Sequence, residues 1–153
     1  MPKINIAEAA LRTTSIYPEP FKSVCAGREK AALGNLAGLT QFGVNLTRLK
    51  PGAASALRHW HESEDEFVYV LEGELTLIED GEETPLRPGE AAGFKAGVAD
   101  GHQLVNNTDR DALYLEIGTR AAADRIFYSD VDMVAVRNER QGTHFMRRSG
   151  ERY

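Results

Sequence analysis

Apolar and polar residues alternate along most of the chain beyond Gln41, which is typical of strands that bury one face. In the first such stretch, Phe42, Val44 and Leu46 alternate with small or polar residues. Further strands are expected at residues 66–71, 75–77, 84–86, 91–94, 102–105, 113–117, 125–128 and 133–136. Short strands at this spacing predict an all-β sandwich or barrel.

Glycine, proline and aspartate mark the turns between these strands. The segments Lys50–Gly52 and Arg87–Glu90 each contain a Pro-Gly pair, which favours a tight turn. Asp80-Gly81 is the strongest hairpin signal, because both turn positions need positive φ and these two residues tolerate it. The turns therefore support a meandering all-β topology.

The chain divides into three stretches within one expected domain, residues 1–153. Residues 1–40 predict an N-terminal arm, because Pro18 and Pro20 bracket an extended piece and glycines interrupt any long helix. A short helix is expected near Ala7–Leu11. Residues 41–118 form the predicted barrel core, and residues 119–153 a C-terminal extension with short helical or extended structure.

Composition narrows the function classes. A chain of 153 residues with a formal net charge of −5 fits one globular domain and argues against a nucleic-acid partner. No apolar run reaches the roughly 18–20 residues needed to cross a bilayer, so no membrane partner is expected. The N-terminus lacks the layout of a secretion signal, which predicts a cytoplasmic protein. The single cysteine, Cys25, excludes an intrachain disulfide and a cysteine-rich metal cage.

Two of the four histidines carry the clearest chemical signal. His59 and His61 lie two residues apart, so on a strand both rings project from one face while Trp60 points away. Two parallel imidazoles can bind one metal ion, and Glu66 opens the next strand with a carboxylate for the same ion. The alternative is an exposed acidic loop with incidental histidines.

The spacing around these residues resembles the first sequence motif of the cupin superfamily. Gly52, His59, His61, Glu66 and Gly73 match it in order, with one extra residue between Gly52 and His59. The stretch after Glu66 also looks like the strand–turn–strand of that motif.

The second cupin motif is recognisable in altered form. Gly89, Gly97, His102 and Asn106 match it, whereas Lys95 stands where the family usually has proline. Four residues rather than two separate Gly97 from His102, so the loop before His102 is longer than in the family's motif. The resemblance covers about residues 41–118.

The resemblance implies a cupin double-stranded β-helix, that is, a jelly-roll barrel, with one divalent metal ion inside its wider mouth. The implied ligands are His59, His61, Glu66 and His102, and the ion is Zn, Fe, Mn or Ni. Many relatives dimerise through an N-terminal arm, so a homodimer is expected.

The sequence most resembles small bacterial cupins that are often labelled sugar-phosphate isomerases, which implies a small polar metabolite as ligand. Such an isomerase needs a base, for which Glu116 is a candidate, and Tyr114 and Arg58 are further catalytic candidates. Phosphate recognition would use cations at the rim, where Arg48, Arg58 and Lys95 are available. The full set of residues expected to line the pocket is Arg48, Arg58, Tyr69, Gln103, Tyr114 and Glu116.

Two other functions stay open at this point. A dioxygenase, decarboxylase or lyase could use the same ligands with iron, manganese or nickel. A sugar-binding module without catalysis is the other alternative. His144, the remaining histidine, is expected at the surface.

Overall fold

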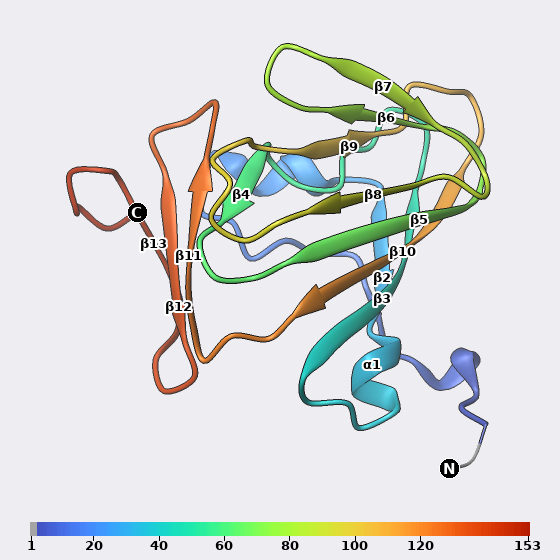
Figure 1. The fold of residues 1–153 in the computed structure, drawn as a ribbon, viewed down its shortest axis with the longest axis horizontal. Helices are drawn as coiled ribbons and strands as arrows, with labels where there is room; N and C mark the ends of the chain where they lie inside the picture. The colour runs from blue at the N-terminus through green and yellow to red at the C-terminus, as the bar shows by residue number, and fades with distance from the viewer. Residues whose placement is uncertain (1–2) are drawn as a thin grey trace.

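The computed structural model describes residues 3–153 and confirms the all-β cupin fold (Figure 1). Thirteen strands form a six-stranded sheet, β1-β2-β3-β10-β5-β8, a four-stranded sheet, β13-β12-β11-β4, and a three-stranded sheet, β7-β6-β9. Within residues 3–153, neighbouring strands pair antiparallel throughout. The four-stranded and three-stranded sheets meet through an isolated bridge between His59 and His102, so that they enclose the barrel opposite the six-stranded sheet.

The strands are short, as the alternation predicted. Their bounds are β1 Leu11–Arg12, β2 Arg28–Ala31, β3 Phe42–Leu49, β4 His59–His61, β5 Glu66–Glu72, β6 Leu75–Ile78, β7 Glu83–Leu86, β8 Ala91–Phe94, β9 Gln103–Val105, β10 Ala112–Thr119, β11 Ala123–Tyr128, β12 Val134–Asn138 and β13 Gly142–Met146. The helical segments are η1 Ile6–Glu8, η2 Phe21–Cys25 and α1 Leu33–Leu36. Within residues 3–153, no helix is both long and apolar enough to span a bilayer.

An apolar core closes one end of the barrel. Val68 and Val70 of β5 point inward against Leu49, Leu75 and Leu104 from the surrounding strands, and all five are buried. Burial of such side chains contributes roughly 1.5–3 kcal/mol each before the entropy of folding is counted. The other end of the barrel is therefore where polar inward-facing residues gather.

The N-terminal segment, expected to be an arm, is woven into this architecture. β2 pairs with β3 and extends the six-stranded sheet, and β1 pairs with β2. Tyr17 and Cys25 are buried in a second apolar cluster, together with Tyr128 and Met133 beside the four-stranded sheet. Residues 11–31 therefore help to build one wall of the barrel.

Two local expectations were wrong. The helix expected near Ala7–Leu11 is a single 3₁₀ turn at Ile6–Glu8, followed by β1, because Leu11 pairs across to Ala31. The Asp80-Gly81 hairpin exists, but pairing between β6 and β7 ends at Ile78 and Glu83, which leaves a four-residue loop. In this longer loop only Gly81 has positive φ, at 84°.

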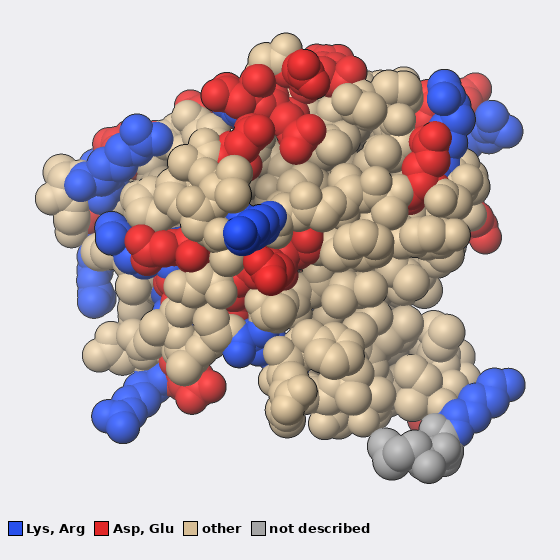
Figure 2. Space-filling model, viewed as in Figure 1, with Lys and Arg blue, Asp and Glu red and all other residues tan. Residues whose placement is uncertain are grey.

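The outer face of the six-stranded sheet is unusually apolar. Phe67, Tyr69 and Leu71 of β5 alternate with the buried residues and are 38–43% exposed. Phe42, at the start of β3, is also exposed. Figure 2 shows a broad area with few charged side chains over β5 and β8, whereas acidic residues gather at the β6–β7 hairpin. Such a face is of the kind that a homodimer could bury, and the homodimer stays a prediction.

Candidate metal centre

His59 and His61 project from the same face of β4, as their two-residue spacing predicted. Their ring centroids lie 5.1 Å apart. Trp60 lies on the opposite face, where its ring stacks on Phe127 of β11 at 4.4 Å and an interplanar angle of 14°. The strand therefore turns both imidazoles toward the barrel interior.

His102 reaches the same place from the other motif. It lies directly opposite His59, with reciprocal backbone hydrogen bonds of 3.1 and 2.9 Å between the two residues. Its ring stacks face to face on Phe94, with centroids 3.5 Å apart. The longer loop before His102 fits because its residue 101 is a glycine that packs closely against Ser129. A Cβ at this position would lie 2.0 Å from Ser129 Oγ, so no larger residue fits without a shift. The structure thus brings His102 beside the other two histidines.

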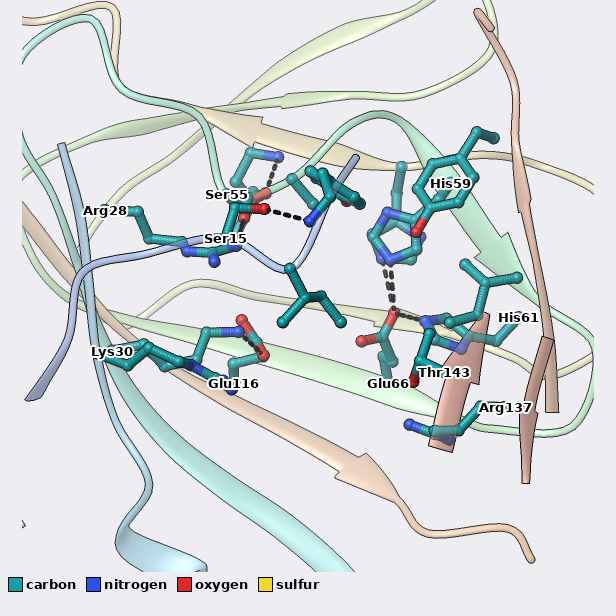
Figure 3. A pocket seen from close by; sticks show the side chains of 18 of the residues that line it. Ser15, Arg28, Lys30, Ser55, His59, His61, Glu66, Glu116, Arg137 and Thr143 are labelled. Carbon is teal, nitrogen blue, oxygen red and sulfur yellow. Dashed lines mark hydrogen bonds and ion pairs between the residues drawn. The ribbon is translucent and has the colours of Figure 1, made fainter. Parts of the chain in front are cut away.

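The three imidazoles converge on one carboxylate oxygen (Figure 3). Glu66 Oε2 lies 2.9 Å from His102 Nε2, 3.3 Å from His61 Nε2 and 3.7 Å from His59 Nε2. Burial alone would raise the pKa of Glu66, but its contacts with the three rings outweigh burial and hold that pKa well below its ordinary value. Glu66 is therefore an ionised carboxylate at the centre of the cluster.

The opposite nitrogens of two rings are fixed by the surrounding chain. His59 Nδ1 lies 2.7 Å from the carbonyl oxygen of Leu57, and His61 Nδ1 lies 2.6 Å from Asp124 Oδ2. An Nδ1–H that donates to these oxygens leaves each Nε2 unprotonated and able to bind a metal. Burial lowers the pKa of His59 to about 4, so this ring is neutral at neutral pH. Two of the rings are thus oriented as ligands.

Asp124 holds His61 within a buried network. Burial would lower the pKa of His61, but the hydrogen bond with Asp124 and the charge of Glu66 outweigh burial and raise it. Asp124 also accepts a 2.8 Å bond from the backbone N–H of Ser63. Arg137 contacts Glu64 and lies 3.8 Å from Asp124, so its single positive charge offsets part of the charge of these two carboxylates. The side chains of His61, Glu64 and Asp124 also converge. In this second cluster, however, Glu64 is already paired with Arg137, and Asp124 with His61.

A cavity of about 220 Å³ opens on one side of the cluster, and we call it the basic cavity. Its wall carries Arg12, Arg28 and Lys30 from β1 and β2, and Arg137 from β12. Tyr114 and Glu116 of β10 also line it, as the sequence predicted for both residues. Figure 3 shows Arg28 and Lys30 at one end of this cavity and the metal-ligand candidates at the other.

A second cavity, of about 190 Å³, lies on the other side of the cluster, and we call it the acidic cavity. It shares His61, Glu66 and His102 with the basic cavity. Its other lining residues come from β4, β8 and the loops, and they are Trp60, Glu64, Glu79, Gly93, Phe94, Lys95, Val98 and Asp100. The cluster therefore separates two spaces with different charge.

Several residues expected at the pocket lie elsewhere. Arg58 pairs with Asp130 at 2.7 Å, Arg48 pairs with Asp111 at 3.3 Å, and neither lines either cavity. Tyr69 is exposed on the outer sheet face. Gln103 is also absent from both cavity linings and donates to the backbone carbonyl of Ala56. His144, which was not expected at the pocket, lines neither cavity.

Sequence reasoning missed the cations that do line the basic cavity. Arg12, Arg28 and Lys30 lie in the segment that had been assigned to an arm. Their only local signal is the alternation of Arg28 and Lys30 around Glu29, which places the two cations on one strand face. Asp124 could have been noticed as a polar residue in phase with Ile126 and Tyr128, which also face this cavity.

Comparisons with known proteins agree with this geometry. The cupin domain family model matches residues 45–118. A sugar phosphate isomerase of the cupin superfamily from Silicibacter pomeroyi is 44% identical, with a TM-score of 0.96 over 99% of this chain and 96% of that one. A protein from Acidithiobacillus ferrooxidans, proposed to be a sugar phosphate isomerase, is 27% identical, with a TM-score of 0.80 over 92% and 86%.

A more distant likeness extends only to the fold. A polyketide cyclase from Streptomyces resistomycificus is 21% identical, with a TM-score of 0.62 over 78% of this chain and 79% of that one. A search of curated proteins found no match. The barrel, the His-x-His strand and the 44% identical relative agree, and the chain belongs to the cupin superfamily.

Proposed function

We propose that His59, His61, Glu66 and His102 bind one divalent metal ion. The observation that carries this proposal is the convergence of three imidazole Nε2 atoms on Glu66 Oε2, all within 3.7 Å. Glu66 Oε2 is buried and, apart from these three ring nitrogens, has no hydrogen-bond partner among residues 3–153, as expected of an atom whose partner is an ion. Three imidazoles and one carboxylate suit Zn, Fe, Mn or Ni.

The function we propose is isomerisation of a small sugar or sugar phosphate. It rests on the 44% identical relative that is named a sugar phosphate isomerase. When bound, a divalent ion would supply Lewis-acid polarisation of a substrate carbonyl and its neighbouring hydroxyl. The chain itself must then supply a base that moves a proton between adjacent carbons.

Glu116 is the base in this proposal. Lys30 Nζ donates to its Oε1 at 2.6 Å, and Asn45 Nδ2 donates to the same atom at 3.3 Å. Both donors bind Oε1, and no donor among residues 3–153 forms a hydrogen bond with the other oxygen, Oε2. Oε2 is therefore free to accept a proton inside the basic cavity. Lys30 and Asn45 thereby fix the orientation of the carboxylate toward a bound substrate.

Elemental analysis of protein purified without added metal tests the metal site. About one ion per chain is expected, and Glu66→Gln should reduce the content below about a tenth of an ion. His144→Ala is the matched control, because it removes a histidine that lines neither cavity. Equal metal content in wild type and Glu66→Gln would contradict the assignment.

Turnover of aldose and ketose phosphates tests the reaction. Glu116→Gln should reduce turnover by at least about a hundredfold, the range typical of a lost general base, without changing metal content. A metal-loaded chain that binds sugar phosphates without converting them would favour the binding module instead. Iron together with oxygen consumption would favour the dioxygenase alternative.

A further inference from the structure

The basic cavity holds three cations at the end away from the metal-ligand cluster, whereas Arg137, at the end beside the cluster, is paired with Glu64 (Figure 3). β1 and β2 are in register, so Arg12 lies directly opposite Lys30, and Arg28 points to the same face two residues earlier. Like charges directly opposite each other in an antiparallel pair are destabilising unless a counter-charge lies between them. Within the described part of the chain, the only carboxylate that forms an ion pair with any of these three cations is Glu116, which pairs with Lys30.

Arg28 retains most of its hydrogen-bonding capacity. Its guanidinium donates to the backbone carbonyl of Ser55, and it forms no ion pair with any carboxylate in residues 3–153. Arg12 likewise has no ion-pair partner in the described range. A guanidinium offers five N–H donors in a planar fork that matches the oxygens of a phosphate or carboxylate. The half-buried Arg28 therefore presents unused donors to the cavity.

A second, independent feature points to a ligand here. Tyr114 is completely buried and lines the cavity, yet its hydroxyl has no hydrogen-bond partner among residues 3–153. Such an orphaned buried hydroxyl normally costs stability, which a ligand acceptor would relieve. Burial, reinforced by the charge of Glu116, raises the pKa of Tyr114, so the hydroxyl keeps its proton and can donate it in a hydrogen bond.

We propose that Arg28, assisted by Arg12, Lys30 and Tyr114, binds the anionic group of a small metabolite whose reacting carbons lie between Glu116 and the metal-ligand cluster. The ligand is then a molecule with a phosphate or carboxylate at one end and hydroxyl or carbonyl oxygens at the other. This inference rests on the proposed function for the reacting end, but the anion subsite itself consists of residues outside the metal site. Strand β2 thereby determines which substrates the enzyme accepts.

Titration calorimetry with inorganic phosphate on the metal-free chain tests the subsite by itself. Arg28→Gln should weaken phosphate binding at least about tenfold, because charge-assisted hydrogen bonds are lost. Arg48→Gln is the matched control: it removes an arginine from the adjacent strand β3, outside both cavities, and should change binding less than about twofold. Equal binding by wild type and Arg28→Gln would overturn the proposal.

Arg12→Gln keeps the test decisive if Arg28→Gln does not fold. Arg12 is exposed, so folding does not depend on it, and its loss should weaken phosphate binding about threefold. If Arg28→Gln does not fold and the folded Arg12→Gln chain binds phosphate as tightly as wild type, the proposal would also be overturned.

A comparison of glucose 6-phosphate, glucuronate and glucose on the metal-loaded chain identifies the anion. If glucose 6-phosphate binds more tightly than glucose and Arg28→Gln abolishes the difference, the ligand carries a phosphate. If glucuronate shows the same pattern, the ligand carries a carboxylate. If glucose binds as tightly as both acids, the subsite does not exist. A chain that holds no metal but binds phosphate through Arg28 would refute the proposed function and leave the subsite intact.

Discussion

The two cavities beside the metal-ligand cluster share three side chains but differ in charge and in origin. The basic cavity takes Arg12, Arg28 and Lys30 from β1 and β2 and Arg137 from β12, whereas the acidic cavity takes Glu79 and Asp100, together with one cation, Lys95, from loops. A strand position fixes the direction of its side chain through backbone pairing with a neighbouring strand, and a loop position does so less strictly. This difference supports our proposal that an anionic ligand binds on the basic side.

The largest effect is expected where the two cavities share a wall. His102 stands between them, stacked on Phe94, so His102→Ala should both remove a ligand and join the two spaces. Loss of an outer partner of a metal site already costs 10–100-fold in affinity, so we expect metal affinity to fall at least about a hundredfold. Competition with a chelator measures it. Unchanged affinity would show that His102 is structural.

Asp124→Asn should weaken metal binding about 10–100-fold, because Asp124 orients His61 from outside the cluster. The same chelator competition measures the effect. Asp130→Asn is the control, since Asp130 pairs with Arg58 outside both cavities. An equal loss in the two variants would indicate a general change in charge rather than the loss of an oriented ligand.

The pH dependence of metal affinity sharpens this point. The pKa of His61 lies above its ordinary value of 6.5, and protons compete with a metal for Nε2. Affinity should therefore fall as the pH is lowered through that pKa, and Asp124→Asn should move the fall to lower pH. In the metal-free chain, a raised pKa contributes stability that is present below 6.5 and lost as the pH rises through the pKa of the folded state. Urea unfolding at several pH values measures that contribution.

Tyr114→Phe tests the basic cavity with a smaller change. The variant removes one hydroxyl and leaves the ring in place, so glucose 6-phosphate should bind about three- to tenfold more weakly. Stability should stay the same or rise, since the hydroxyl has no partner within residues 3–153. Thermal unfolding measures stability. A clear loss of stability without any loss of binding would mean that Tyr114 serves only the core.

The smallest effect is expected in the acidic cavity. Glu79→Gln and Asp100→Asn remove charges that line this cavity and no other, so glucose 6-phosphate binding should change less than about twofold at moderate salt. Calorimetry on the metal-loaded chain checks this. A tenfold gain in binding would mean that the anion enters from the acidic side, and the comparison of the cavities would then be reversed.

The metal-ligand candidates were largely predictable because local geometry defines them. His59 and His61 share a face in any strand, and Glu66 opens the next strand after a short turn. Asn106 follows His102 at the spacing of the second motif. Its side-chain amide donates to the backbone carbonyls of Leu49 and Arg110, which holds the loop after β9 in place. The register of His102 was less certain, since only the approach of Gly101 to Ser129 shows how the longer loop fits.

The sequence by itself determined an all-β fold, most of the strands between residues 42 and 136 and the residues of the two motifs, because alternation and short-range spacing act within a few residues. Only the tertiary structure decided what surrounds them. Lys30 meets Glu116 and His61 meets Asp124 across 86 and 63 residues, and such pairs depend on strand register that no local pattern specifies. The charge of the basic cavity, and with it the anionic ligand we propose, follows from that register.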